Sequence, residues 1–460
     1  MRAPAESRPI DALVAEIGST ATVVSAFGGL TGLSAAADGP RLLGQGVAAT
    51  TVAEGDVGLG IDEARRALET QTGPLDPQVT LATSSAAGGL RMTVHGLTEK
   101  MTAMAAREAA LGAGGVLVHQ TAGRLRDSDL AAIDAARPGL ILLAGGVEGG
   151  DSQTVLHNAG RLTRLGGRPI VLYAGNSSAA PEARELLEGA GFRVRVTANV
   201  YPRVDELDIG PARAAIHDAF EEHITHAPGM ERIGHWVTGR VLPTPGAVLL
   251  AAEALAAGIG DLLVVDVGGA TTDVHSVTGG SPEIAAISLD PQLHSKRTVE
   301  GDLGTFVSAE HAAALLPAEE RPAALPPALP ATPAEESAAS SLARIAAVTA
   351  VRRHAGRLVH HYTPTGRQTV ARGRDLTACR LVIGTGGALV RLPDGLATLE
   401  ATRAPVGGGS ELLLPPAEAR CALDTDYLFA CCGALLAHFD ASAVVALMRK
   451  SIGTYPEGTI

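Results

Sequence analysis

The clearest pattern along this chain is an apolar run that meets an acid, turns at two glycines and continues as a second β-rich run. It reads Leu262-Leu-Val-Val-Asp-Val-Gly-Gly-Ala-Thr-Thr-Asp-Val-His-Ser-Val277. Apolar and β-branched residues on both sides of a Gly-Gly pair predict a strand, a tight turn and a second strand. We therefore expect a β-hairpin whose turn lies at Gly268 and Gly269.

A weaker copy of this pattern lies near the start of the chain, and a third glycine turn lies near its end. The first is Ala12-Leu-Val-Ala-Glu-Ile-Gly-Ser-Thr-Ala-Thr-Val-Val-Ser-Ala26, and the third is Leu381-Val-Ile-Gly-Thr-Gly-Gly-Ala-Leu389. An isolated glycine pair is more often an ordinary tight turn. Three such turns in this order are a more specific signal.

Between the first two hairpins the chain alternates short apolar runs with amphipathic stretches. After a strand at 79–83, the pattern predicts helices at 97–111, 128–136, 153–165 and 181–190, and strands at 115–119, 140–144, 169–173 and 193–197. Such alternation implies a parallel sheet covered on both faces, with ligands at the carboxyl ends of its strands. Gly145-Gly146 and Gly149-Gly150 fit either a ligand loop or a plain helix entry. Ser84-Ser-Ala-Ala-Gly-Gly-Leu-Arg-Met92 fits an anion site or a turn equally.

The second half of the chain has fewer regular patterns. We expect helices at 213–223, 245–257 and 342–353, a last apolar helix at 427–448, and a surface loop at 317–337 that is rich in proline and alanine. The segment Lys296-Arg-Thr-Val-Glu-Gly-Asp-Leu-Gly304 is predicted to be a charged, glycine-punctuated loop.

These residue types favour phosphate chemistry. Glycines at 268 and 269 let backbone N–H groups approach anionic oxygens, and Thr271 and Thr272 add hydroxyl donors. Asp266 ends a buried strand and is suited to hold Mg²⁺ through water, because this ion prefers a few carboxylates and keeps several waters. Either Glu300 or Asp302 is a candidate to position a water for attack on a phosphate.

Composition narrows the function further. The chain has 460 residues, 46% of them hydrophobic, with a net charge of −12 and only 3% aromatics, and its mean hydropathy is +0.19. We expect no nucleic acid and no membrane as partner, because a basic stripe and stacking platforms are missing. Four cysteines form no C-x-x-C pair, and residues 1–9 lack the apolar core of a signal peptide. We therefore expect a cytoplasmic protein.

The three turns together resemble those of the actin, sugar-kinase and heat-shock-chaperone ATPase superfamily. The resemblance implies an α/β, actin-like (ribonuclease H-like) two-lobed ATPase with a parallel α/β middle segment, and ATP with Mg²⁺ between the lobes. It implies that Asp266 and Glu16 hold the metal, and that both act in catalysis with Glu300 and Asp302. The implied nucleotide-binding residues are Gly18, Ser19, Thr20, Gly268, Gly269, Thr271, Thr272, Asp273, Gly384, Gly386 and Gly387.

A closer resemblance covers nearly the whole chain. The motifs are Ser84–Met92, Leu156-His-Asn-Ala159, Pro243-Thr-Pro245, Asp266–Ser276, Arg297-Thr-Val-Glu-Gly-Asp-Leu-Gly304 and Asp424-x-Asp-Tyr427. Together they are similar to the accessory-protein family of the adenosylcobalamin-dependent glutamate (methylaspartate) mutase. This implies an ATP-binding accessory protein or reactivating chaperone, with the mutase subunits as partners and homo-oligomers as a further option. The implied division is 1–78 and 206–460 for the ATPase lobes and 79–205 for the middle segment.

Two departures from the family pattern bear on activity. The family's first loop begins Asp-Ile-Gly-Ser-Thr, whereas Glu16 holds the Asp position here, and Ala21-Thr22-Val23 replaces the usual Phe-Thr-Lys. These departures predict weak ATP turnover, from a site that has either decayed or adapted to glutamate. Asp273-Val-His275 is interpreted as part of the hairpin, because a cobalt-ligating His motif needs Gly where Thr278 stands. The alternatives are a small-molecule kinase or hydantoinase-like ATP-dependent hydrolase subunit, and a non-catalytic nucleotide-binding scaffold.

Overall fold

The computed structural model describes residues 7–31, 39–86, 89–289, 292–363, 366–406 and 411–453. The chain divides into two compact units. The first contains residues 1–49, 63–79 and 247–460, and the second contains residues 50–62 and 80–246. The lobe boundaries expected from the sequence stay a prediction.

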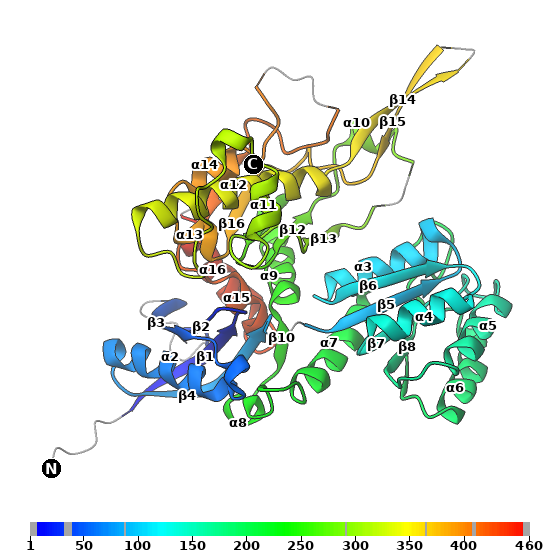
Figure 1. Ribbon diagram of the computed structural model, residues 1–460, viewed down its shortest axis with the longest axis horizontal. Coiled ribbons are helices and arrows are strands. Elements are labelled where there is room, and N and C mark those ends of the chain that lie inside the picture. The colour runs from blue at the N-terminus through cyan, green and yellow to red at the C-terminus, as the bar shows by residue number, and fades with distance from the viewer. Residues whose placement is uncertain are drawn as a thin grey trace. The chain divides into compact units, whose positions relative to one another are not determined.

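A five-stranded parallel sheet forms the centre of the second unit. Its strands are β5 (Arg91–Gly96), β6 (Val116–Ala122), β7 (Leu140–Leu143), β8 (Ile170–Tyr173) and β9 (Val194–Val196), in the order β6-β5-β7-β8-β9 (Figure 1). The predicted alternation and parallel pairing are confirmed. Strand β5 was missed, because its Arg-Met-Thr-Val-His-Gly sequence follows a glycine-rich turn and lacks a long apolar run.

Helices cover this sheet and complete the unit. They are α3 (Met104–Gly112, after a π-helical turn at Glu99–Ala103), α4 (Asp127–Ala136), α5 (Gln153–Leu162), α6 (Ala180–Gly189), α7 (Gly210–Ile224) and α8 (Ile233–Trp236), with 3-10 turns at Val52–Glu54 and Ser177–Ala179. The apolar faces of α4, α5 and α6 pack on β7 and β8 in one buried cluster. This cluster holds the helices on one face of the sheet.

The first lobe is built on β1 (Arg8–Ile17), β2 (Ala21–Gly28) and β3 (Arg41–Ala49), which pair antiparallel. Next in this sheet is β4 (Leu75–Ser84), where the chain passes from the first unit into the second, and β4 pairs in parallel with β10 (Val241–Pro243). Helix α2 (Val57–Thr72) packs closely on β3, since a Cβ on Gly46 would lie 2.5 Å from the Leu68 nitrogen.

A second sheet repeats this design in the first unit. Its strands are β11 (Leu262–Val267), β12 (Thr272–Val277), β13 (Ser295–Glu300), β16 (Leu381–Thr385) and β17 (Arg420–Leu423), in the order β13-β12-β11-β16-β17. In both sheets the first three strands form an antiparallel meander, and the fourth and fifth extend it on the other side of the first strand. This repetition confirms the predicted α/β class with two similar lobes.

The helices of the first unit lie around these sheets (Figure 1). They are α9 (Thr244–Ile259, which begins in the second unit), α10 (Pro282–Ala285), α11 (Ala309–Ala314), α12 (Pro333–His354), α13 (Gly387–Val390), α14 (Gly395–Glu400), α15 (Phe429–Leu435) and α16 (Ala441–Ser451), with a 3-10 turn at Ala318–Glu320. Small side chains of α12 pack on β11, β12 and β16. No helix in the described ranges is long and apolar enough to span a bilayer.

Two sequence predictions in this unit were wrong, and one element was missed. The segment 296–304 is not all loop, because its first half forms β13 as the third strand of the sheet. The helix predicted at 427–448 is two helices, because the Asp440 side chain accepts a hydrogen bond from the Ser442 amide and caps α16. The antiparallel ribbon of β14 (Arg357–Thr363) and β15 (Gly366–Arg372) was not predicted at all.

Candidate functional site

The second and third glycine turns meet at Asp266. Its strand β11 lies between β12 and β16, so that Asp273 and Thr385 are its direct neighbours in register. Gly386 follows with φ +87°, and a Cβ there would contact the Asp266 Oδ1 atom and lie 2.5 Å from the Val267 carbonyl oxygen. Only glycine combines this backbone angle with such a close approach. The predicted third turn therefore lies directly against the predicted metal ligand.

The first turn lies beside the second. Gly18 closes the β1–β2 hairpin through a 3.0 Å hydrogen bond from its amide to the Ala21 carbonyl, and Gly268 closes the second through a 2.9 Å bond to the Thr271 carbonyl. A Cβ on Gly269 would lie 3.8 Å from the Thr20 hydroxyl, and Ser19 is exposed at the tip of the first turn. The structure thus brings the two loops together.

Glu16 lies at the end of β1 with 5% of its surface exposed. Tyr427 donates a 2.7 Å hydrogen bond from its hydroxyl to the Glu16 Oε1 atom. Burial raises the pKa of Glu16 from 4.5 to about 7, and nearby Asp424 adds to this, while the Tyr427 hydrogen bond and Arg391 oppose it. The Arg391 guanidinium lies 5.7 Å from the centre of the Tyr427 ring.

Asp266 shares this acidic environment. Burial raises its pKa well above the usual range, and the charges of Asp273 and Glu16 raise it further against the opposing Arg297. Carboxylates that face one another disfavour each other's ionised form. A cation placed among them would relieve that repulsion, which is what a metal site of this kind requires.

Three of the predicted nucleotide-binding side chains already have protein partners. Asp273 forms a buried ion pair with Arg297, with 2.8 Å from its Oδ1 atom to the arginine Nε, and the Thr272 hydroxyl donates a 2.9 Å bond to the Leu303 carbonyl. The Thr271 hydroxyl donates a 3.3 Å bond to Asp273. These contacts hold the hairpin in shape, together with the backbone bonds of Gly268 and Gly269 within the turn and to the loop at Phe306.

Glu300 and Asp302 are both bound by one arginine. The Arg353 guanidinium on α12 lies 2.6 Å from the Glu300 Oε2 atom and 2.8 Å from the Asp302 Oδ1 atom. Burial raises the pKa of Glu300 against this hydrogen bond, whereas the hydrogen bond lowers that of Asp302. The loop that follows returns to the hairpin, since the Phe306 amide donates a 2.8 Å bond to the Gly269 carbonyl.

The donor set fits Mg²⁺ held together with a phosphate ligand. In the part of the chain that the structure describes, no three His, Cys, Asp or Glu side chains are arranged to hold a metal by themselves. Mg²⁺ usually binds one or two carboxylates plus waters and substrate phosphates, and not a cage made only of protein atoms. Glu16 and Asp266 would supply the carboxylates, and glycine at 386 lets the third turn lie directly against Asp266.

Four residues that support the site were not among the predicted site residues. They are Tyr427, Arg391, Arg297 and Asp424. Asp424 is fully buried and accepts hydrogen bonds from the Leu428 and Phe429 amides and from the hydroxyls of Thr385 and Ser451, which fixes the segment that carries Tyr427. Tyr427 has a positive φ of 54°. The Asp424-x-Asp-Tyr427 motif was the one sequence signal for this segment.

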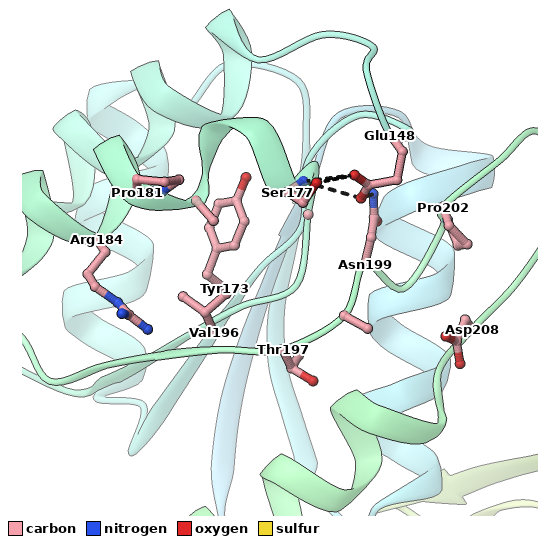
Figure 2. A pocket seen from close by; sticks show the side chains of 13 residues that line it. Glu148, Tyr173, Ser177, Pro181, Arg184, Val196, Thr197, Asn199, Pro202 and Asp208 are labelled. Atoms are coloured by element: carbon pink, nitrogen blue, oxygen red, sulfur yellow. Dashed lines mark hydrogen bonds between the residues drawn. The ribbon is translucent and has the colours of Figure 1, made fainter.

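The second unit holds a separate pocket of about 680 Å³ at the carboxyl ends of β7, β8 and β9 (Figure 2). Glu148 lies at its edge and accepts hydrogen bonds from Ser177 and, at 2.9 Å, from the Asn199 amide. Buried Asn176 and Asn199 hold the preceding glycine loop, through the carbonyls of Gly150 at 3.2 Å and Gly146 at 3.0 Å. The glycine pairs predicted at this sheet edge flank Glu148 in the chain, but they are not among the residues that line the pocket.

The other predicted anion site has a different role. Arg91 begins β5, and its guanidinium donates bonds of 3.0 and 3.2 Å to the Ala136 carbonyl at the end of α4. It therefore lies at the amino end of a parallel strand, away from the edge where ligands bind. Residues 87 and 88 of this motif lie outside the described ranges.

Comparison with known proteins gives consistent matches. A family model described as "MutL protein" matches residues 12–452. "Protein MutL" of Clostridium tetanomorphum is 34% identical over 437 residues, which cover 88% of this chain and 94% of that protein.

Three solved structures are also similar. The diol dehydratase-reactivating factor in nucleotide-free form has 12% identity and a TM-score of 0.31, and covers 85% of this chain and 94% of that one. The PilM–PilN type IV pilus biogenesis complex has 14% identity and a TM-score of 0.27, and the match covers 96% of this chain and 99% of that one. Nucleotide-free acetone carboxylase has 14% identity and a TM-score of 0.27, and the match covers 64% of this chain and 48% of that one.

Proposed function

We propose that this chain, which belongs to the MutL protein family, is an ATP-binding accessory protein of an adenosylcobalamin-dependent mutase. The family accounts for the accessory role toward a mutase. What we propose beyond this is that the chain binds a nucleotide and a metal ion, that its client depends on cobalamin, and that it reactivates this client. The single observation that carries it is the convergence of three glycine turns on Asp266 and Glu16.

In this proposal the chain's residues bind and orient a nucleotide. The backbone of Gly268 and Gly269 and the Ser19–Thr20 turn face the phosphates, and Gly386 and Gly387 face the nucleoside. Asp266 and Glu16 hold Mg²⁺, directly or through water, and the ion supplies positive charge that neutralises the phosphates. Glu300, aligned by Arg353 at 2.6 Å, is the better placed of the two acids to orient a water, because it ends β13 directly across from Thr272.

The first test is ATP binding and turnover of Asp266→Ala. Loss of one main electrostatic group of a preorganised site lowers turnover by about 10²-fold. Asp76→Ala, which removes an exposed acid from β4, is the matched control and should turn over ATP like the parent. If the Asp266 variant keeps the parent rate, the loop has no part in the mechanism.

The second test addresses the client. Calorimetry of the purified chain with the mutase subunits, in ATP, ADP or no nucleotide, should show affinities that differ by about 5- to 150-fold, as is typical of coupled sites. Equal affinities in all three states would favour a passive scaffold. Binding of ATP without binding of any cobalamin-dependent mutase would favour a small-molecule kinase or hydrolase subunit.

A further inference from the structure

The ribbon of β14 and β15, which we call the arm, extends from the first unit as a two-stranded sheet (Figure 1). Its base is fixed on both sides. The Leu358 amide donates a 2.8 Å bond to the Glu411 carbonyl, and the Ala371 amide donates a 2.9 Å bond to the Ile287 carbonyl. Beyond this base the two strands pair only with each other in the described chain. A lone two-stranded ribbon is marginally stable in water.

The charge of the arm is opposite to that of the whole protein. Residues 357–372 contain Arg357, Arg367 and Arg372 and no acid, in a chain of net charge −12. Arg357 and Arg372 are direct cross-strand partners and both are exposed. Neither guanidinium makes an ion pair or side-chain hydrogen bond with any residue that the structure describes. Like charges directly opposite each other destabilise a strand pair, so an anionic neighbour would stabilise this arrangement.

The other face of the arm carries an exposed aromatic side chain. Tyr362 is 82% exposed and lies opposite Arg367, whose guanidinium is 2.6 Å from the His360 Nε2 atom. His360 also lies 3.9 Å from the Glu411 carboxylate at the base. Tyrosine and arginine are the residue types that most often contribute binding energy at protein interfaces. Both faces of the arm therefore carry residue types that are common at protein interfaces.

We propose that the arm docks on an acidic surface of a second copy of this chain, so that the protein forms a dimer by reciprocal arm docking. The copy supplies the complementary charge, because the chain outside the arm carries a net charge of −15, which the arm's three arginines bring to −12 for the whole chain. Two arms do not pair with each other, since that would bring arginine against arginine.

The experiment is sedimentation velocity of the full chain over a range of concentrations. At about 50 mM salt we expect a dimer that dissociates as salt rises to about 500 mM, because exposed charge pairs are screened over a Debye length. Arg357→Glu together with Arg372→Glu should weaken dimerisation by about 100-fold or more, as expected when like charges meet at an interface. The matched control, Arg66→Glu with Arg124→Glu, makes the same charge change at two exposed arginines outside the arm.

A second, milder pair of substitutions distinguishes an effect on docking from an effect on folding. Arg357→Gln with Arg372→Gln removes the repulsion within the arm, so the monomer should be at least as stable to urea as the parent, while its dimer is still weaker by about 10-fold or more. A parent chain that is monomeric at low salt overturns the proposal, and so does a dimer that both arm variants leave unchanged. An arm that instead binds the mutase or DNA, with no dimer, also overturns it.

Discussion

The hydroxyl of Tyr427 donates a 2.7 Å hydrogen bond to the carboxylate of Glu16, although the two residues lie 411 positions apart in the chain. This bond connects the end of β1 with the segment that leads into α15, two parts of the first unit. A buried carboxylate is costly unless donors surround it. Tyr427 therefore makes it possible for an acid to lie in this buried position.

We expect Tyr427→Phe to destabilise the protein through Glu16. The carboxylate loses its donor and its pKa rises above about 7, because the hydrogen bond opposes the effect of burial. An unsatisfied buried acceptor costs about 1–3 kcal/mol of unfolding free energy, which urea unfolding at pH 7.5 measures. Tyr362→Phe, at an 82% exposed position, should change it by less than about 0.5 kcal/mol at about 500 mM salt, where the proposed arm-docked dimer is dissociated. Equal unfolding free energies for the two variants would show that the Tyr427 bond contributes nothing.

The length of the Glu16 side chain gives a second prediction. Aspartate is one methylene shorter and would leave the Tyr427 hydroxyl out of reach, so we expect Glu16→Asp to lower ATP turnover by about 10-fold or more, as displacement by about 1 Å does in position-sensitive sites. Glu16→Gln should lower it as well. Faster turnover by Glu16→Asp would instead show that the glutamate impairs the site.

The pKa of Glu16 also predicts a pH dependence of stability. The folded protein holds a proton on this carboxyl up to about pH 7, whereas the unfolded chain releases it near pH 4.5. The protonated folded form is therefore favoured below about pH 4.5, and this advantage is lost as the pH rises through 7. Relative to Glu16→Gln, which cannot titrate, the parent should lose about 3 kcal/mol of unfolding free energy between pH 4.5 and 7.5. Urea unfolding in the presence of a chelator measures this difference, and parallel pH profiles would contradict it.

Local sequence patterns were sufficient for the two hairpins with glycine turns and for four of the five strands of the parallel sheet, although β5 was missed. The acid, the Gly-Gly turn and the flanking β-branched runs lie next to one another in the chain, so Asp266 and its loop were predicted from neighbouring residues alone. The alternation of apolar and amphipathic stretches that predicted β6 to β9 also depends only on residues that are close together in the chain.

Features that depend on distant partners were not predicted. Tyr427 contacts Glu16 only because β1 lies beside it, and the Asp424-x-Asp-Tyr427 motif does not indicate this distant partner. Strand β13 begins Ser-Lys-Arg and was interpreted as a charged loop, yet its Arg297 is buried by an ion pair with Asp273. The arm has no apolar face, so hydrophobic alternation could not predict it. In each case tertiary pairing overrides the local pattern.

Gly386 and Gly387 allow a test of the third turn with adjacent residues. At Gly386 the positive φ and the contacts with Asp266 and Val267 leave no room for a Cβ. We expect Gly386→Ala to lower the unfolding free energy by about 2–4 kcal/mol, since strained backbone and steric overlap each contribute. At Gly387 nothing lies within 4 Å of the added Cβ, so Gly387→Ala should unfold like the parent or be more stable by up to about 1 kcal/mol, as alanine is in a helix.

The open space at Gly387 is also where the proposed nucleoside would lie. A methyl group there would occupy the ligand's volume while the protein stays folded, so Gly387→Ala should weaken ATP binding by about 10-fold or more without a loss of stability. Fluorescent-nucleotide titration and urea unfolding of the same preparation separate the two effects. If Gly387→Ala binds ATP as the parent does, the third turn lies outside the nucleotide site, and the glycines at 386 and 387 serve only to let β16 pass close to Asp266.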